Sequence, residues 1–430
     1  MKISVIGLGY LGAVTAASLA SLGHKVVGFD HDASKINDYN NNHIQFHEPG
    51  LQNLINENMQ GNKLSFMSTK HFDGYLGDVA VIGVGTPSTT DGNYDMRQVN
   101  NAMDWVLGRT ENLQAIVMKS TVPPGTGTKF TKSLIPMNHI SYYSCPEFLR
   151  EGNALNDFLH PDRIIIGNNS KEEGELIRNL YRGIDAPYVF TDTTTAEMIK
   201  CSANVFLSTK ISFINSVANL CGAVGANIDD VQKGLGLDPR IGQYYLNPGV
   251  GYGGSCLPKD TLSFARIMEN NNIENDLIAS VIKINELQKQ QPFQYLRSRI
   301  KCIEDLKVGV LGLSFKPNTD DVRESPAIPL VKQLVRAGAS VTAYDPFANA
   351  KAKNALLGSP VPHFAKSIEE CTHGTNVVFV MHTWEEMESV DWANMSSRMR
   401  SPKIIYDSRN SLDPNLMRRH NFEYVPIGKR

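Results

Sequence analysis

Short apolar runs alternate with helix-like stretches over the first part of the chain. Residues 3–6 and 25–29 are compact β-rich runs, and residues 11–22 between them are rich in Ala and Leu. This order predicts a βαβ unit, in which a crossover helix joins two parallel strands. Further strand-like runs follow at 79–84, 115–118 and 163–166. We therefore expect a doubly wound parallel sheet in a first domain over residues 1–192.

A long stretch with helical spacing begins at Thr193 and continues to about Gly225. One of the three threonines at 193–195 is expected to cap it, and Glu197 to lie in its first turn, where the helix dipole favours an acid. The apolar positions of this stretch are Met198, Ile199, Val205, Phe206, Phe213, Ile214, Val217 and Leu220. With more helical sequence at 262–300, it predicts an all-helical middle domain over residues 193–300.

The last part of the chain repeats the pattern of the first. Residues 307–313 form a glycine-punctuated strand, 327–337 a helix and 340–344 a strand that ends at Asp345, with later strands at 377–381 and 403–406. This predicts a second α/β domain over residues 301–430. The expected fold class is therefore α/β, with two Rossmann-like doubly wound domains joined by a long central helix and an all-helical middle domain.

Composition excludes several classes of function. The 430 residues exceed one ordinary core, and the net charge of -2 with interspersed acids and bases provides no basic stripe for nucleic acid. The six cysteines are scattered without a C-x-x-C pair, so neither a disulfide framework nor a metal site is expected. All of them except Cys256 are expected to pack as small buried apolar groups. The N-terminal apolar stretch imitates a secretory signal but is interrupted by glycines, and no run reaches the ~18 residues that span a bilayer. We expect a cytoplasmic protein that contacts neither membrane nor nucleic acid.

A glycine fingerprint marks a dinucleotide site at the first strand-to-helix turn. Gly7, Gly9 and Gly12 fit the G-x-G-x-x-G spacing, which permits a tight turn and close approach to a pyrophosphate at the helix N-terminus. Asp30 ends the second strand, where a carboxylate binds a ribose diol and repels a 2′-phosphate. NAD is therefore favoured over NADP, although His31 and Lys35 leave a small opening for NADP. The loop at 83–88, with Thr86 and Pro87, should also lie at the ligand-binding edge, unless it is an ordinary turn.

Two further motifs carry groups suited to chemistry. Cys256 lies among small residues with Lys259 and Asp260 close behind it, so its sulfur has little cover and can reach a substrate. The alternative is a glycine turn with an incidental cysteine. Lys200 and Asn204 are four residues apart on the long helix and project from one face, where they could converge on one oxygen or simply face solvent.

Taken together, these motifs resemble one family over essentially the whole chain: the NAD-dependent nucleotide-sugar dehydrogenases, which oxidise a sugar C6 alcohol to a carboxylate. The resemblance includes Glu-Pro-Gly-Leu at 48–51, Lys-Ser-Thr-Val-Pro-Pro-Gly-Thr at 119–126 and Pro-Glu-Phe-Leu-Arg-Glu-Gly at 146–152. It also includes the Lys200/Asn204 helix, the cysteine motif and the run from 314 to 326.

The resemblance implies a role for each matching residue. It makes Cys256 the nucleophile and places around the substrate carbon and its water Lys200, Asn204, Asp260, Thr121 and Glu147. Besides the fingerprint, it implies cofactor contacts from Tyr10, Leu11, Lys35, Thr86, Pro87, Thr121, Glu151 and Arg323. Substrate contacts are implied for Phe148, Leu149, Lys200, Asn204, Arg240, Tyr245, Asn247, Gly253, Phe315, Lys316 and Arg409. It further implies a homodimer packed through the long helix, with Arg240 crossing into the neighbouring site.

The identity of the sugar nucleotide rests on finer similarities. The segments at 238–254 and the Phe-Lys-Pro-Asn-Thr-Asp-Asp run at 315–321 look like the branch that acts on UDP-glucose. The loop at 83–88 and the serine before Cys256 are more typical of the GDP-mannose branch, and enzymes for N-acetylated UDP sugars rank third. Outside this chemistry, the alternatives are a simple alcohol dehydrogenase and a catalytically silent NAD-binding protein.

Overall fold

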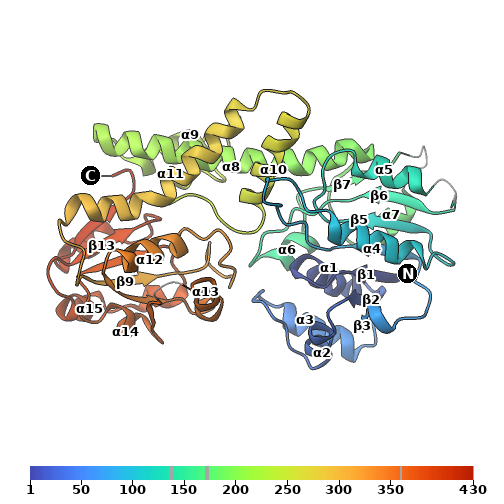
Figure 1. Ribbon diagram of the computed structural model, residues 1–430, viewed down its shortest axis with the longest axis horizontal. Coiled ribbons are helices and arrows are strands. Elements are labelled where there is room, and N and C mark those ends of the chain that lie inside the picture. The colour runs from blue at the N-terminus through green and yellow to red at the C-terminus, as the bar shows by residue number, and fades with distance from the viewer. Residues whose placement is uncertain (135–136, 138, 170–173, 359–360, 430) are drawn as a thin grey trace. The chain divides into compact units, whose positions relative to one another are not determined.

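The computed structural model describes residues 1–134, 137, 139–169, 174–358 and 361–429. The chain divides into two compact units, Met1–Ala203 (unit 1) and Asn204–Arg430 (unit 2). Helix α8 (Thr193–Val224) is continuous through the point of division (Figure 1).

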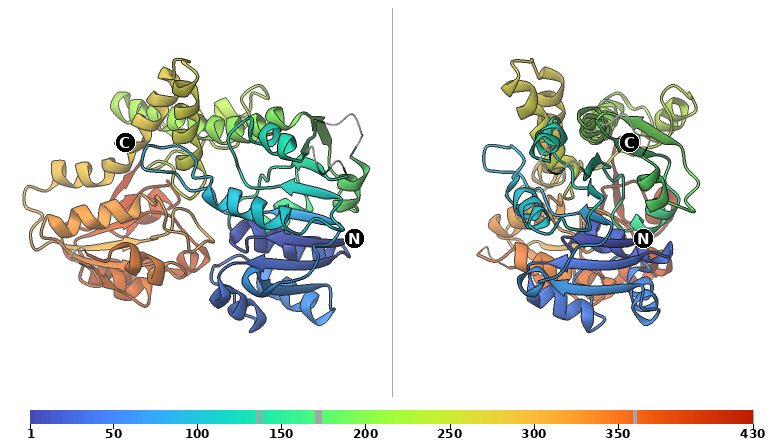
Figure 2. Two further views of the ribbon diagram at one scale, coloured as in Figure 1. Left: turned by 45° about the vertical axis from the view of Figure 1, so that its right-hand side comes forward. Right: turned by 90° about the vertical axis from the view of Figure 1, so that its right-hand side faces the viewer.

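Unit 1 is built on one sheet with the strand order β3-β2-β1-β4-β5-β6-β7-β8 in its described residues (Figures 1 and 2). All neighbouring strands are parallel except β6 and β7. The strands are β1 (Lys2–Ile6), β2 (Lys25–Asp30), β3 (Leu64–Ser68), β4 (Val79–Ile82), β5 (Ala115–Met118), β6 (Ser141–Ser144), β7 (Ile164–Gly167) and β8 (Tyr188–Thr191). The helices are α1 (Tyr10–Ser21), α2 (Ala33–Asn40), α3 (Leu51–Gln60), the 3₁₀ turn η1 (Thr69–His71), α4 (Arg97–Leu107), α5 (Thr126–Ser133), α6 (Ala154–Leu159) and α7 (Glu175–Leu180).

The sheet of unit 1 is covered on both faces, which explains its continuous apolar strands. Ile3 and Val5 of β1 belong to a core shared with α1 and α3, whereas Ile6 belongs to a core on the other face shared with α4. Successive side chains of a strand point to opposite faces, so a doubly covered strand needs apolar residues at nearly every position. The carboxyl ends of these strands form the edge at which ligands bind in such folds.

Unit 2 contains a fully parallel sheet with the order β11-β10-β9-β12-β13-β14 in its described residues. Its strands are β9 (Lys307–Leu311), β10 (Ser340–Tyr344), β11 (His363–Phe364), β12 (Val377–Val380), β13 (Ile404–Asp407) and β14 (Glu423–Pro426). Its helices are α9 (Ile228–Gly236), α10 (Leu257–Asn270), α11 (Asp276–Arg299), α12 (Ala327–Arg336), α13 (Asn349–Ala355), α14 (Ile368–Thr372), η2 (Glu385–Ser389), α15 (Trp392–Arg398) and α16 (Pro414–Arg419). The predicted class, two Rossmann-like sheets with a long central helix, is confirmed. The predicted domain boundaries at 192 and 300 stay predictions.

Several local expectations need correction. The start of α8 is capped by Asp192 and not by a threonine: the Thr195 N–H donates to Asp192 Oδ1 at 2.9 Å. Glu197 lies beyond the first turn of α8 and is buried. The sequence also missed the strands β3, β8, β11 and β14. Within the described residues, none of the helices combines the length and the hydrophobicity that a bilayer crossing requires.

Candidate active site

The glycine turn of unit 1 has the backbone that a dinucleotide requires. Gly7 adopts φ +89°, and its N–H donates to the Phe29 carbonyl at 2.7 Å, which ties the start of the turn to β2. A Cβ on Gly12 would lie 1.7 Å from the Gly7 carbonyl oxygen, so only glycine fits there. A Cβ on Gly9 would meet no described atom within 4 Å, so a phosphate has room to approach the start of α1. The backbone of this turn thus leaves room for a pyrophosphate, and Tyr10 and Leu11 open the helix behind it.

Asp30 ends β2 beside this turn. Its Oδ2 accepts from the Leu8 N–H at 2.8 Å and from Lys35 Nζ at 2.8 Å. Burial alone would raise the pKa of Asp30, but Lys35 and the backbone N–H groups of Asp32 and Leu8 outweigh burial and lower it. Asp30 is therefore a carboxylate at neutral pH, as a ribose-binding acid must be. Lys35 stands beside the carboxylate and offsets part of its repulsion of a 2′-phosphate.

Replacing Asp30 with Ser should weaken NAD binding by about tenfold, because two charge-assisted hydrogen bonds to the ribose would be lost. It should also improve the use of NADP relative to NAD, since the repulsion of a 2′-phosphate disappears. The matched control is Asp32→Ser, which keeps an oxygen that can cap α2. Titration of both variants with NAD and NADP measures the effect. Unchanged affinity for both cofactors in Asp30→Ser would contradict the assignment.

A buried ion pair lies at the carboxyl ends of β5 and β6. Lys200 Nζ is 3.1 Å from Glu147 Oε1, and the side chains are 4% and 10% exposed. Glu147 Oε2 accepts from the Leu149 N–H at 2.5 Å, which fixes the carboxylate within its own loop. A cavity runs beside this pair and is lined by Met118, Ser120, Thr121, Val122, Ser144, Pro146, Glu197 and Lys200. Three predicted catalytic residues, Thr121, Glu147 and Lys200, are thus brought together.

The loop at 146–152 holds other predicted residues. The Phe148 ring lies 3.7 Å from the Arg163 guanidinium carbon and 5.2 Å from Lys200 Nζ, so cations flank it. Leu149 packs against the hydrophobic core of unit 1. The Thr86 hydroxyl donates to the Thr121 carbonyl at 2.8 Å, which joins the loop at 83–88 to Thr121, whereas Pro87 is exposed.

Tyr10 ties the start of α1 to the same loop. Its hydroxyl donates to Glu48 and accepts from the Gly152 N–H at 2.9 Å. Glu48 also accepts from the Ala154 N–H at 2.7 Å, at the start of α6. Glu151, next to Gly152, is partly buried near Tyr10. The Glu-Pro-Gly segment thus anchors the loop that carries Glu147.

The predicted nucleophile lies at the start of a helix in unit 2. Cys256 is the N-cap residue of α10, is partly exposed, and has its Sγ 3.4 Å from the Ser255 hydroxyl. Helix N-termini favour the thiolate form of a cysteine. Asp260, one turn later, is buried and accepts from Asn204 Nδ2 and from Lys259 Nζ. The structure therefore joins Asn204 and Asp260 directly, and Lys200 is one turn before Asn204 on α8.

The glycines before Cys256 allow close packing on the run at 314–326. A Cβ on Gly253 would lie 2.3 Å from the Glu324 carbonyl oxygen, and one on Gly254 would lie 2.8 Å from the Phe315 ring. The Gly254 N–H donates to the Arg323 carbonyl at 2.9 Å. Lys316 Nζ is 5.6 Å from the centre of the Phe315 ring. Within unit 2, Phe315 and Arg323 thus contact the cysteine loop, which includes Gly253, and Lys316 lies beside Phe315.

Other predicted substrate residues lie on separate parts of unit 2. Arg409 is half-buried and packs on Gly249, where a Cβ would meet its guanidinium at 2.5 Å. Burial lowers the pKa of Arg409, and Asp407 opposes this. Arg240 is exposed and forms an ion pair with Asp238 at 2.6 Å. Asn247 is exposed and accepts from Gln232 Nε2 at 2.5 Å, and Tyr245 adopts φ +63°.

Two features of the structure were not found from the sequence. The first is Glu197, which lines the cavity beside Lys200. Burial raises the pKa of Glu197, and hydrogen bonds from the Gly127 N–H, the Ser144 hydroxyl and the Gly125 N–H oppose this. A signal was present in the sequence, because Glu197 is four residues before the buried Cys201 and so shares its helix face.

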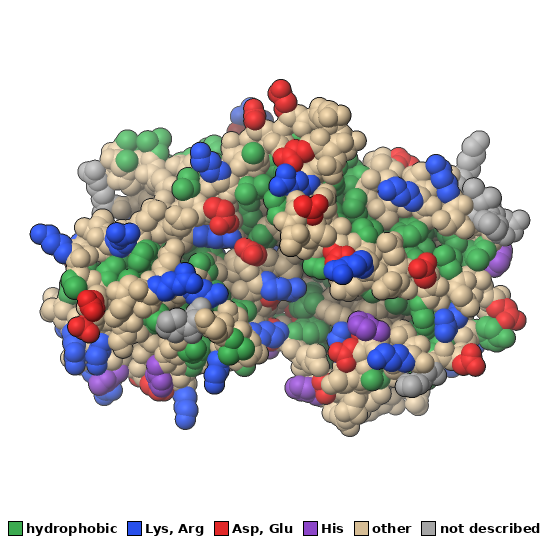
Figure 3. All heavy atoms as spheres, in the orientation of Figure 1, with side chains coloured by type: hydrophobic (Ala, Val, Ile, Leu, Met, Phe, Trp, Pro, Cys, Tyr) green, Lys and Arg blue, Asp and Glu red, His purple; other side chains and the backbone are tan. Residues whose placement is uncertain are grey.

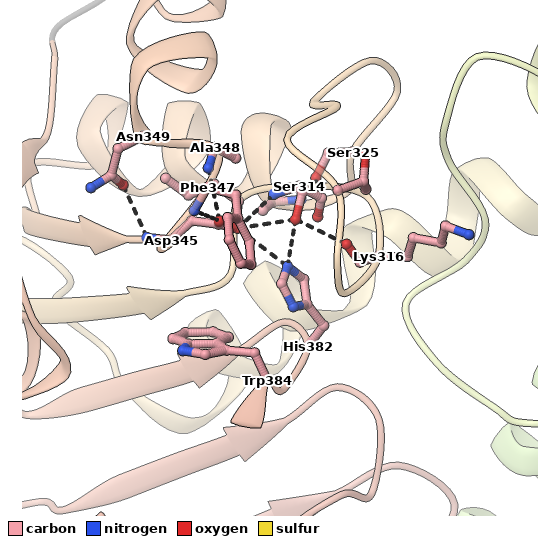
Figure 4. Close-up of polar contacts among 12 residues, drawn as sticks. Ser314, Lys316, Ser325, Asp345, Phe347, Ala348, Asn349, His382 and Trp384 are labelled. Carbon is pink, nitrogen blue, oxygen red and sulfur yellow. Dashed lines mark hydrogen bonds and ion pairs between the residues drawn. The ribbon is translucent and has the colours of Figure 1, made fainter. Parts of the chain in front are cut away.

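The second feature is a polar cluster at the glycine turn of unit 2 (Figure 4). The Ser314 hydroxyl lies 3.0 Å from Asp345 Oδ2 and 2.8 Å from His382 Nε2, and Lys316 extends away from this cluster. Asp345 directly follows β10, much as Asp30 ends β2, and it accepts from the Leu313 N–H at 2.8 Å. The two units thus share the same turn geometry. In unit 2, however, the Asp345 carboxylate already accepts hydrogen bonds from groups of the protein.

The cysteines other than Cys256 were expected to be buried. Cys145, Cys201, Cys221 and Cys371 are buried, but Cys302 is exposed, so the expectation was wrong for Cys302. Cys145 Sγ is 3.3 Å from the Tyr181 hydroxyl, which accepts from the buried Lys119 at 3.0 Å. All six cysteines lie among the described residues, and none is in a disulfide. Among the described residues, no group of three or more His, Cys, Asp or Glu side chains could hold a metal ion.

Comparison with known proteins accounts for both units. Models of the UDP-glucose/GDP-mannose dehydrogenase family match the chain in order: the NAD binding domain at residues 1–185, the central domain at 194–287 and the UDP binding domain at 309–414. The chain belongs to the UDP-glucose/GDP-mannose dehydrogenase family. The predicted family and the NAD cofactor are confirmed.

Relatives of this dehydrogenase family align over the full length of the chain. UDP-glucose 6-dehydrogenase YwqF of Bacillus subtilis is 37% identical over 100% of this chain and 98% of its own. UDP-glucose 6-dehydrogenase of Rickettsia conorii is 38% identical over 100% of both chains. The structure of a UDP-glucose dehydrogenase from the archaeon Pyrobaculum islandicum matches with a TM-score of 0.90 and 35% identity, over 100% of this chain and 98% of that one. The protein is thus an NAD-dependent nucleotide-sugar dehydrogenase, as predicted.

Proposed function

We propose that the protein is a UDP-glucose 6-dehydrogenase, which oxidises the sugar C6 alcohol to the carboxylate of UDP-glucuronate in two steps. The observation that carries the proposal is the partly exposed thiol of Cys256 at the start of α10, with buried Asp260 one turn later. A thiol is unnecessary for alcohol oxidation alone but allows an aldehyde to be held covalently. Similarity to UDP-glucose 6-dehydrogenases and to the UDP binding domain supports the choice of UDP-glucose.

The proposed chemistry balances without a metal ion. The alcohol loses a proton and a hydride to give an aldehyde, and the Cys256 thiolate adds to its carbon while the carbonyl oxygen takes up a proton, which forms a thiohemiacetal. Loss of a second hydride together with the hydroxyl proton gives a thioester, which water cleaves to the carboxylate, the thiol and a proton. NAD, when bound, supplies the hydride acceptor for both oxidations.

The other predicted catalytic residues are proposed to stabilise charge and to place water. Lys200 and Asn204, one turn apart on α8, would stabilise the oxyanions, and Asp260 would hold the Asn204 amide in place. Glu147 and Thr121 would position the hydrolytic water beside Lys200. The predicted cofactor contacts remain proposals for Tyr10, Leu11, Lys35, Thr86, Pro87, Glu151 and Arg323, as do the substrate contacts of Phe148, Leu149, Arg240, Tyr245, Asn247, Gly253, Phe315, Lys316 and Arg409.

A panel of sugar nucleotides tests this function. The purified protein is mixed with NAD and UDP-glucose, GDP-mannose, UDP-N-acetylglucosamine or UDP-N-acetylmannosamine, and NADH absorbance is followed. UDP-glucose is expected to give the highest kcat/KM. Preference for GDP-mannose would establish the alternative suggested by the loop at 83–88 and by Ser255. No NADH with any sugar would indicate a silent NAD-binding relative.

We also propose that the protein is a homodimer packed through α8. Phe206, Phe213 and Leu220 recur at intervals of seven residues on α8, so they share one face, and they are 64%, 54% and 61% exposed. Apolar side chains are also visible over the C-terminal part of α8 and over α9 (Figure 3). A second copy of the chain would cover this stripe. We place the protein in the cytoplasm, which agrees with six cysteines outside disulfides.

Replacing Phe213 with Glu should convert the dimer to a monomer, because a carboxylate would have to be buried in an apolar contact. Light scattering at several protein concentrations measures the mass. Leu357→Glu is the matched control, since Leu357 is also apolar and 68% exposed but follows α13 and is not part of α8. A monomeric wild type, or a Phe213→Glu variant that stays dimeric, would refute the proposed interface.

A further inference from the structure

Glu197 is a buried carboxylate held by neutral donors. It is 3% exposed. Its Oε2 accepts from the Gly125 N–H at 2.7 Å, and its Oε1 accepts from the Gly127 N–H at 2.7 Å and from the Ser144 hydroxyl at 3.0 Å. Both carboxylate oxygens are therefore used, and each points at a group from a segment more than 50 residues away.

These contacts fix the start of α5 against α8. Gly125 is the N-cap residue of α5, with φ +93°, and Gly127 is the second residue of the helix. A Cβ on Gly127 would lie 2.6 Å from the Thr193 Cβ and 3.0 Å from Glu197 Oε1, so the two helices meet without space for a side chain. A carboxylate at a helix N-terminus interacts favourably with its N–H groups and dipole.

The segment that Glu197 holds also carries Thr121. Only Val122, Pro123 and Pro124 separate Thr121 from Gly125. The two prolines restrict this connection, so its end at Gly125 limits where Thr121 lies. Thr86 fixes Thr121 from the other side, through the hydrogen bond of 2.8 Å to its carbonyl. The position of Thr121 is thus determined at two points, one of which is Glu197.

The same carboxylate lies on the face of α8 that carries Lys200. The two residues are three apart on the helix, so their side chains are neighbours, and both line the cavity with Thr121. Glu197 therefore connects the element that presents Lys200 to the loop that presents Thr121. Both Glu197 oxygens accept hydrogen bonds from the start of α5 and from Ser144. Its role is therefore to support the other residues.

We propose that Glu197 is a positioning residue that holds Thr121 at a fixed place relative to Lys200, so that water is aligned for hydrolysis of the thioester on Cys256. The proposal rests on the function proposed above and adds a residue to it. Glu197→Gln keeps the size of the side chain but replaces one acceptor oxygen with an NH₂ group that would face a backbone N–H. The variant should therefore release the start of α5 and disturb the Thr121 loop.

Rapid mixing of Glu197→Gln with NAD and UDP-glucose separates oxidation from hydrolysis. We expect a burst of about two NADH per active site at a rate within about twofold of wild type, followed by a steady rate reduced by about tenfold or more. The KM for NAD should stay within about twofold. Intact-mass analysis of quenched samples should then show the sugar-nucleotide acyl group on the protein, at higher occupancy than in wild type.

Two further variants keep the inference testable. Thr194→Val breaks the neighbouring contact between α5 and α8, a hydrogen bond of 3.2 Å to Thr128, and is expected to leave all phases unchanged. Ser144→Ala removes only the third donor to Glu197 and should slow the steady phase by about two- to fivefold. This variant tests the inference even if Glu197→Gln does not fold.

The contradicting results are distinct from failure of the proposed function. A folded Glu197→Gln with a wild-type steady rate, or a Ser144→Ala variant with no slowing, would overturn the inference. So would an equal loss of burst rate, steady rate and NAD affinity in Glu197→Gln, since that would be a general structural effect. If the wild type itself forms only one NADH per sugar, the four-electron function is wrong, whatever these variants do.

Discussion

Replacing Cys256 with Ser is expected to lower kcat for UDP-glucose oxidation by more than about a thousandfold. A serine hydroxyl has nearly the same size but stays protonated at neutral pH, so it cannot capture the aldehyde as the thiolate does. Cys256 lies at the start of α10 in unit 2, whereas the glycine turn and Asp30 belong to unit 1. NAD affinity, measured by titration, should therefore remain within about twofold of wild type.

The exposed Cys302 provides the matched control for this prediction. Cys302→Ser should leave turnover unchanged, because Cys302 lies on the surface outside the motifs that carry the chemistry. In the Cys302→Ser variant all cysteines except Cys256 are buried, so iodoacetamide should modify Cys256 first. The rate at which the enzyme is inactivated should equal the rate at which Cys256 is modified. A Cys256→Ser variant that turns over at the wild-type rate would remove the thiol from the mechanism.

Replacing Asp345 with Asn should destabilise unit 2 by about 3 kcal/mol or more at neutral pH. One oxygen of Asp345 accepts from the Phe347 and Ala348 N–H groups at 2.9 Å, and the other accepts from Leu313 and Ser314. An asparagine would place an NH₂ group against one of these pairs of donors, and N–H groups cannot accept its hydrogens. His382, 3.3 Å from the carboxylate, would lose its acidic neighbour as well.

The size of this effect should depend on pH. Burial alone would raise the pKa of Asp345, but His382 and the backbone N–H groups of Ser314 and Leu313 outweigh burial and hold the pKa well below its usual range. The stability from a depressed carboxyl pKa is fully present above the unfolded value of about 3.9 and is lost as pH falls below it. The difference between wild type and variant should therefore be largest near pH 7 and shrink below about pH 4.

Urea unfolding followed by tryptophan fluorescence measures this difference. Trp384 lies 5.7 Å from His382 in ring centroids, so its emission reports on the cluster. Ser411→Ala is the matched control, because it removes one hydrogen bond of 3.3 Å to Asp407, the carboxylate that ends β13. An Asp345→Asn variant as stable as wild type at pH 7 would show that the cluster contributes little to folding.

The strands that could be predicted from the sequence are those buried on both faces. Every residue of β4, β5 and β12 is buried, so each is a continuous apolar run. The strands that were missed at sheet edges are short or half-exposed: β8 has two exposed residues, and no residue of β14 is buried. β6 gives a weaker signal along the chain, since its Ser-Tyr-Tyr-Ser sequence is buried but not apolar. Its place in the sheet is set by pairing with β5, which is a tertiary contact.

The same distinction applies to the site. Cys256 and the glycine turn were found because neighbours in sequence carry the signal, and the i,i+4 spacing of Lys200 and Asn204 carries it too. Glu197 was treated as a helix-dipole residue because its partners come from β6 and α5, and no spacing along the chain connects them. The capping by Asp192 was missed because three consecutive threonines offered an equally suitable oxygen.

The ratio of NADH formed to sugar consumed tests the central claim most directly. A limiting, known amount of UDP-glucose is converted to completion with excess NAD, and the final absorbance of NADH is compared with the UDP-glucuronate recovered. The account predicts two NADH for each UDP-glucose, with no aldehyde remaining. One NADH for each sugar, with the aldehyde accumulating, would contradict it and identify the protein as a simple alcohol dehydrogenase.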